Sequence, residues 1–120
     1  MSAYTPAQVV EKTGFGLDTL RYYEKIGLLS DVERTAAGQR RYTEAHVEWL
    51  GTIGCLRDTG MPIAQMLRFA ELVRAGDHTF AERIALLREH DERVGEQIAT
   101  LRDRRRYITA KIEYYERALS

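Results

Sequence analysis

The stretch LDTLRYYEKIGLL (17–29) has the apolar spacing of a short amphipathic helix, with an arginine and two tyrosines at its centre. Its apolar residues recur three and four positions apart, as they do along one face of a helix. We predict a helix over residues 17–25. Gly27 stands where a glycine commonly ends a helix in a left-handed conformation. The three bulky central side chains either close a core or face a partner outside the protein.

The helical spacing divides these three residues between two faces. Tyr23 is expected to pack inward, whereas Arg21 and Tyr22 are expected to point outward. An exposed arginine can fork onto guanine edges or clasp a phosphate, and a tyrosine hydroxyl can bind a phosphate. A solvated helix face is the alternative, and this stretch alone does not separate the two.

A second short helix is predicted just before this one. Thr5, Pro6 and Gln8 have the pattern of a capping residue, a proline at the first helical position and a capping-box partner. The predicted helix covers residues 6–12, and two glycines make the connection a tight turn, which completes a helix-turn-helix layout. The residues expected to close its core are Val9, Val10, Phe15, Leu20 and Tyr23.

Residues 30–42 (SDVERTAAGQRRY) lack helical periodicity and follow the second helix directly. The AAG triplet at 36–38 predicts a turn between two short extended arms. Arg34, Arg40 and Arg41 fall within eight residues that contain no acid. A basic hairpin placed after a helix-turn-helix is arranged like the wing of a winged helix, and this favours a DNA-binding surface over a solvated helix face.

Composition narrows the function without deciding it. The chain has 120 residues, with 18 basic and 18 acidic side chains, so a DNA-binding surface has to come from local placement of charge. One cysteine and three scattered histidines exclude a disulfide framework and give no metal-ligand spacing. We found no signal peptide, membrane-length apolar run, phosphate loop or catalytic motif. We therefore expect a cytoplasmic protein that is not an enzyme and has no catalytic residues, metal or cofactor.

Two further helices are predicted between the hairpin and the C-terminal segment. Residues 44–58 follow a threonine cap, and residues 62–75 lie between a proline and a glycine. We expect residues 1–76 to form a winged helix-turn-helix DNA-binding domain with connecting helices. Residues 77–120 would form a dimerisation helix, with no separate effector domain.

The last predicted helix has the strongest periodicity in the chain. It begins after a second capping-box pattern, Thr79 with Glu82, and its apolar residues alternate at steps of four and three. Such a helix spans roughly 60 Å at about 1.5 Å per residue. The preceding domain is too small to cover this stripe, so we predict a homodimer. The stripe positions are Phe80, Ile84, Leu87, Asp91, Val94, Ile98, Leu101, Arg105, Ile108, Ile112, Tyr115 and Leu119.

Two stripe positions carry charge. Asp91 and Arg105 lie seven residues on either side of Ile98. In a parallel dimer like charges would meet, whereas in an antiparallel dimer that crosses near Ile98 each aspartate approaches the partner's arginine. We predict an antiparallel two-helix coiled coil in which these charges act against the parallel alternative. The other interpretation is that both side chains extend into solvent and carry no information on orientation.

The runs TLRYYEKIGLL (19–29) and RTAAGQRRY (34–42) together resemble the N-terminal signature of the MerR family of bacterial transcription regulators. The predicted order of elements extends this resemblance over essentially the whole chain. It implies a mostly α fold and DNA contacts from the recognition helix and the wing. Gln39 and Gly16 depart from many members, which have tyrosine and a serine or threonine there. The expected DNA-binding residues are Thr19, Arg21, Tyr22, Arg34, Arg40, Arg41 and Tyr42.

The resemblance also implies a mechanism. Such regulators bind a pseudo-palindromic operator in double-stranded DNA as antiparallel coiled-coil homodimers. They bend and untwist an overlong promoter spacer so that RNA polymerase can engage both promoter elements. A simple dimeric repressor without a sensor is one alternative. A coiled-coil adaptor that binds protein is another, but it would leave the basic hairpin unexplained.

Cys55 lies in IGCLRDTGMPI (53–63), which resembles a MerR subgroup with one cysteine near the end of the third helix. That subgroup is linked to aldehyde, nitrosative or thiol stress. On a helical wheel Cys55 lies opposite the apolar face formed by Trp49, Ile53 and Leu56, so we expect a thiol that is either accessible or placed against a neighbouring helix. Cys55 is therefore a candidate sensor residue, and a small packing residue is the alternative.

Overall fold

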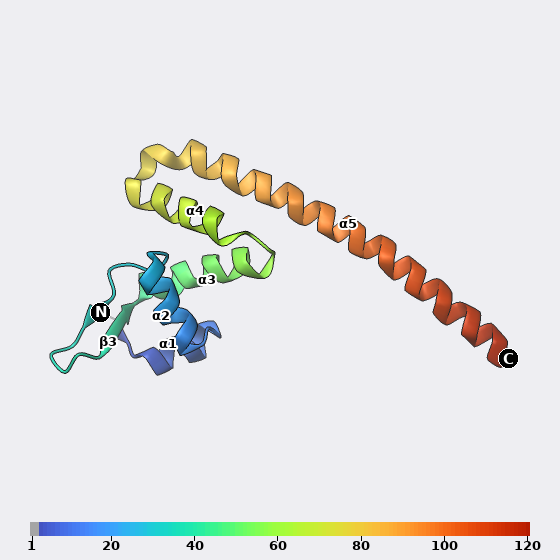
Figure 1. Ribbon diagram of the computed structural model, residues 1–120, viewed down its shortest axis with the longest axis horizontal. Coiled ribbons are helices and arrows are strands. Elements are labelled where there is room, and N and C mark those ends of the chain that lie inside the picture. The colour runs from blue at the N-terminus through green and yellow to red at the C-terminus, as the bar shows by residue number, and fades with distance from the viewer. Residues whose placement is uncertain (1–2) are drawn as a thin grey trace. The chain divides into compact units, whose positions relative to one another are not determined.

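The computed structural model describes residues 3–120, and most of them lie in five α-helices (Figure 1). It confirms the predicted mostly α fold, with a winged helix-turn-helix, two further helices and one long C-terminal helix. No helix in this range is long and apolar enough to cross a membrane. The elements are β1 (Ala3–Tyr4), α1 (Pro6–Thr13), α2 (Leu17–Ile26), β2 (Glu33–Arg34), β3 (Arg40–Thr43), α3 (Glu44–Asp58), α4 (Ile63–Ala75), the 3-10 helix η1 (Asp77–Thr79) and α5 (Phe80–Leu119).

Local capping explains where the first two helices begin and end. The Thr5 hydroxyl accepts the Gln8 amide at 3.2 Å and the Gln8 side chain accepts the Thr5 amide at 2.9 Å, which confirms the predicted capping box. Gly14 and Gly27 end α1 and α2 in the left-handed region, with φ of +78° and +85°. Gly16 begins α2 without a side-chain cap, so that end of α2 depends on the turn before it.

The hairpin is confirmed, but it belongs to a three-stranded sheet in the order β1-β3-β2. Sequence analysis missed β1, because two residues ahead of a helix cap are too few to show strand alternation. A hydrogen bond of 2.5 Å from the Tyr4 hydroxyl to the Glu44 carboxylate joins β1 to α3. The antiparallel register pairs Ala3 with Thr43, Tyr4 with Tyr42, Glu33 with Arg41 and Arg34 with Arg40.

The core of the first unit contains four of the five apolar residues predicted from the helix pair. Val9, Phe15, Leu20 and Tyr23 are at most 4% exposed, whereas Val10 is half-buried. The rings of Phe15 and Tyr23 meet edge to face, with centroids 5.6 Å apart. The turn between α1 and α2 is therefore held by packing as well as by its glycines.

His46 connects the start of α3 to the segment that follows α2. Its Nδ1 accepts the Thr43 amide at 2.9 Å, and the Thr43 hydroxyl accepts the His46 amide at 3.3 Å. These bonds leave the proton on Nε2, which donates to the Ser30 carbonyl at 2.8 Å. The Trp49 indole donates to the Leu28 carbonyl at 2.8 Å. His46 and Trp49, one turn apart on α3, thus hold the segment that leads from α2 into the wing.

The chain divides into two compact units at the junction of Thr79 and Phe80. The Thr79 hydroxyl is buried and lies 2.6 Å from the Leu72 carbonyl, which connects η1 to α4. The second unit is α5 alone, a single helix of 40 residues. Its apolar stripe is open along much of its length: Ile98 is 45% exposed and Leu101 is 64% exposed.

Candidate nucleic-acid interface

The helix α2 presents Arg21 and Tyr22 outward, as predicted. The side chain of Arg21 is 59% exposed and that of Tyr22 is exposed, whereas Tyr23 is buried. The nearest carboxylate to Arg21 is that of Asp18, at 3.7 Å, and an exposed pair of this kind contributes little. Thr19 is half-buried. The guanidinium and the phenol are therefore available to a partner on the outer face of α2.

The wing does not present its arginines on one side. Successive strand residues point to opposite faces, so Arg40 and Arg41 on β3 lie on different faces of the sheet. Directly paired residues share a face, which places Arg34 with Arg40 and Glu33 with Arg41. The predicted basic hairpin therefore has two different faces. One face carries Arg34 and Arg40, and the other carries Arg41 beside Glu33.

The first of these surfaces meets α2 at Glu24. The Arg40 Nε lies 2.8 Å from one Glu24 carboxylate oxygen, and the Arg34 guanidinium lies 3.8 Å from the other. Arg34 also donates to the Gly38 carbonyl at 3.2 Å. The hydrogen bond to Glu24 raises the pKa of Arg40, so this guanidinium is firmly positive. The three side chains form a cluster of net charge +1 that connects α2 to the wing.

Tyr42, which was predicted to contact DNA, is buried in the structure. Its side chain is 1% exposed and packs edge-on against His46, with ring centroids 5.9 Å apart. Burial raises the pKa of the Tyr42 hydroxyl, while the positive charge of Arg40 acts in the opposite direction. A buried ring has no surface to offer a phosphate. Tyr42 instead fixes the base of the wing to α3, and Arg40, on the same face of β3, is directed to a partner within the protein.

Glu24 is a residue of this candidate surface that was not predicted from the sequence. It lies on α2 one helical turn after the buried Leu20 and is itself only half-buried. A carboxylate on an inward face requires a charged partner, because burying it alone is costly. The cost of burying an unpaired carboxylate, together with the arginines of the following hairpin, could have indicated from the sequence that Glu24 pairs with the wing. In the structure the Glu24 carboxylate pairs with the two wing arginines, Arg34 and Arg40.

Cys55 is exposed, as expected, on the last turn of α3. Its carbonyl accepts the Thr59 amide at 3.1 Å and the Thr59 hydroxyl at 2.8 Å. The guanidinium of Arg57 covers the Phe15 ring at 4.4 Å and pairs with Asp58 at 3.0 Å, so the nearest cation in sequence is already engaged. Across residues 3–120 no group of three or more His, Cys, Asp or Glu side chains is placed to hold a metal ion.

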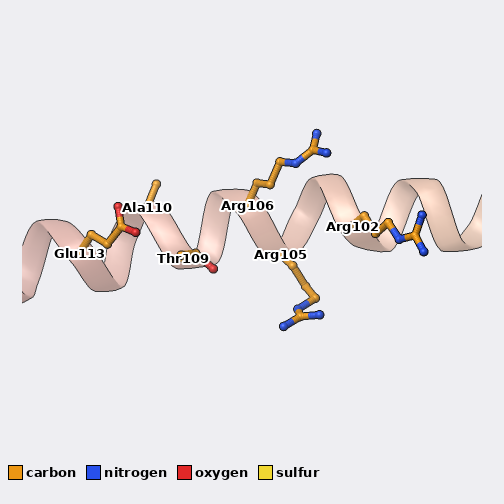
Figure 2. Close-up of a pocket in the computed structure, with 6 residues that line it drawn as sticks. All are labelled: Arg102, Arg105, Arg106, Thr109, Ala110 and Glu113. Atoms are coloured by element: carbon orange, nitrogen blue, oxygen red, sulfur yellow. The ribbon is translucent and has the colours of Figure 1, made fainter.

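On α5 the predicted stripe charges are exposed. Asp91 and Arg105 both face solvent. Figure 2 shows Arg105 and Arg106 leaving the helix on opposite sides. Arg106 pairs with Asp103 at 3.0 Å, so it is neutralised on its own helix. Of these two arginines, Arg105 is the one at a stripe position.

Two protein families match parts of the chain. Residues 4–70 match the MerR HTH family regulatory protein, and residues 47–111 match the MerR DNA-binding region. An uncharacterised HTH-type transcriptional regulator of Haemophilus influenzae is 39% identical over 115 residues, which are 96% of this chain and 85% of the relative. AdhR of Bacillus subtilis is 35% identical over 88 residues, which are 73% of this chain and 63% of AdhR.

Solved structures agree with these matches. The chain is similar to HiNmlR, a MerR family regulator lacking the sensor domain and crystallised bound to promoter DNA. The TM-score is 0.87 at 38% identity, over 98% of this chain and 93% of HiNmlR. A MerR family protein of Listeria monocytogenes has a TM-score of 0.87 at 27% identity, over 94% of this chain and 86% of that one. The outward arginine of α2, the wing and these matches show that the chain belongs to the MerR family of DNA-binding transcription regulators, and that it is not an enzyme.

Proposed function

We propose that the protein binds a pseudo-palindromic promoter operator as a homodimer and activates transcription by bending and untwisting an overlong promoter spacer. RNA polymerase would then engage both promoter elements. The observation that carries this proposal is the outward pair Arg21 and Tyr22 on α2, next to the Arg34 side of the wing. The similar protein HiNmlR was crystallised on promoter DNA. Neutral net charge is compatible with binding because these groups lie on neighbouring elements.

The outer face of α2 supplies the proposed sequence-reading contacts. Arg21 can bind a guanine edge or a phosphate, and the Tyr22 hydroxyl can bind a phosphate. Thr19 lies two residues before Arg21 and is partly accessible. Arg34 and Arg41 supply backbone contacts from opposite faces of the wing. In this arrangement α2 sets the sequence preference and the wing adds affinity.

A second copy of α5 is the proposed partner of the apolar stripe. Ile98, Leu101 and Ile112 are all exposed along a helix of 40 residues. An uncovered apolar stripe of this length is unfavourable in water. Another copy of the same helix has the same heptad spacing and the same length, so it covers the stripe end to end. This is the basis for the homodimer.

Charge segregation along α5 favours the antiparallel orientation. Residues 89–96 contain four acidic side chains and one basic one, and residues 102–106 contain four basic side chains and one acidic one. An antiparallel pair centred on Ile98 places each acidic segment beside the partner's basic segment. Asp91 then approaches the partner's arginine at position 105. A parallel pair would place each segment beside its own copy, where like charges repel.

A salt-dependent binding assay on the DNA upstream of the protein's own gene tests the proposal. We expect a symmetric footprint, and an affinity that falls steeply with salt because each neutralised phosphate adds about 0.9 to the logarithmic slope. Gel mobility with a permuted binding site should show bending, and transcription in vitro should increase. Binding without bending, together with reduced transcription, would identify a simple repressor. Absence of DNA binding at low salt would support the protein adaptor.

We also propose that the exposed thiol of Cys55 makes this regulator responsive to electrophiles. The supporting observations are its exposure and the resemblance to single-cysteine members of the family. Incubation with formaldehyde, methylglyoxal or a nitrosothiol should add mass to the protein, measured intact. Cys55→Ser should abolish both the added mass and any change in promoter output. Unmodified protein with unchanged promoter output would exclude this sensor role.

A further inference from the structure

The proposed DNA-binding surface contains a carboxylate among its arginines. Glu24 and Arg40 each retain 25% of their side-chain exposure, and Arg34 retains 50%. A negative charge close to a phosphate backbone opposes binding. Electrostatics alone would therefore predict that the protein binds DNA less tightly with Glu24 than without it.

We propose that Glu24 is a positioning residue: it holds the wing at a set distance from α2 and thereby favours specific operator binding over binding to random DNA. The proposal rests on the DNA-binding surface described under Proposed function. The wing needs such a connection because β2 has only two residues and β3 has four. β3 is anchored by the buried Tyr42 and by pairing with β1, whereas the edge strand β2 pairs only with β3, so the turn end of the hairpin gains a fixed orientation from a contact with α2.

The connection is made at the turn end of the wing, where Arg34 and Arg40 pair on either side of residues 35–39. Arg40 is two residues before Tyr42, whose buried ring anchors β3 to α3. The short contact of 2.8 Å between Glu24 and Arg40 therefore joins α2 to the strand that Tyr42 anchors. Arg34 lies across β3 from Arg40 and takes the other carboxylate oxygen. One carboxylate thus orients both strands of the wing relative to the recognition helix.

The two arginines differ in how firmly Glu24 holds them. Arg40 is largely covered and makes the close contact, so it stays with Glu24 when DNA is bound. Arg34 is half exposed, 3.8 Å from the carboxylate, and supported by the Gly38 carbonyl. A phosphate can replace the weak contact with Glu24, because an ionised phosphate oxygen is a strong acceptor for arginine. Arg34 is therefore held in place before binding and released to the DNA on binding.

Net charge alone predicts that removing the Glu24 carboxylate strengthens operator binding, whereas the positioning role predicts that it weakens operator binding. This difference in sign makes the proposal testable. Glu24→Gln removes a negative charge but also releases both arginines from a defined position. We expect operator affinity to fall roughly fivefold to tenfold per half-site, the scale of a partly exposed charge-assisted hydrogen bond. Affinity for random DNA, which needs no defined orientation, should stay level or rise. The ratio of specific to random affinity is the quantity that decides.

The experiment measures both affinities by fluorescence anisotropy at several salt concentrations, with the full chain. Glu11→Gln is the matched control, because Glu11 is an exposed glutamate on α1 and its loss changes the net charge equally. Arg40→Gln should reproduce the fall in the ratio. The double variant should fall no further than either single variant, because both remove the same connection. Thermal unfolding of each variant shows whether the fold is retained, and Arg40→Gln decides if Glu24→Gln is unfolded.

An unchanged or increased ratio in Glu24→Gln would overturn the positioning role, as would additive losses in the double variant. Failure of the proposed function looks different, since the wild type would then bind operator and random DNA equally. An equal decrease in the ratio for Glu11→Gln would also overturn the inference, because it would assign the effect to net charge.

Discussion

Replacing Arg21 with alanine is expected to remove specific operator binding while leaving the fold and the dimer intact. A bidentate arginine–base contact contributes about 1–3 kcal/mol of discrimination. A homodimer loses this contact in both half-sites, so the affinity should fall by about 30-fold to 20,000-fold. The fold should survive because the Arg21 side chain is 59% exposed and its pair with Asp18, at 3.7 Å, is loose.

Fluorescence anisotropy on the footprinted operator measures this loss, with circular dichroism and sedimentation velocity as checks on the fold and the dimer. Arg68→Ala is the matched control, because Arg68 is an exposed arginine on α4 and its loss changes the net charge equally. Its operator affinity should be nearly unchanged. Equal losses in the two variants would show that Arg21 acts only through net charge, and wild-type affinity in Arg21→Ala would remove it from the interface.

The features predicted correctly from sequence are those set by neighbours in the chain. The capping box of Thr5 and Gln8 and the stop at Gly27 involve residues within one helical turn. The inward position of Tyr23 follows from helical spacing. The single helix α5 follows from a repeat sustained over its whole length. In each case the signal and the structure it predicts lie in the same segment.

The features missed or mistaken depend on contacts between distant segments. Tyr42 is part of the run RTAAGQRRY (34–42) that resembles the family signature, but its burial depends on which face of β3 meets α3. β1 is stabilised by pairing with β3, far along the chain, so its two residues carry no local signal. Glu24 is explained only when the wing folds back onto α2 and brings Arg40 to 2.8 Å. Local patterns located the candidate interface, and tertiary packing decided which of its residues face outward.

Replacing Ile98 with aspartate is expected to convert the proposed dimer into a monomer. Ile98 lies at the centre of the stripe, is 45% exposed on the single chain, and would face the partner's copy of itself. Each dimer loses two buried isoleucines, at about 1.5–3 kcal/mol each, and gains two like charges in an apolar seam. The dissociation constant of the dimer should therefore rise by at least about 100-fold.

The matched control for this change is Thr100→Asp, which adds the same charge at an exposed position of α5 outside the stripe. Sedimentation velocity should give monomers for Ile98→Asp and dimers for Thr100→Asp. A monomer binds one half-site at a time and loses the high effective concentration that a linked second site provides. Ile98→Asp should therefore lose the symmetric footprint while keeping the helical content of the full chain. A persistent dimer would exclude the stripe as the interface. Monomers with wild-type operator affinity would exclude cooperative binding of two half-sites as the source of that affinity.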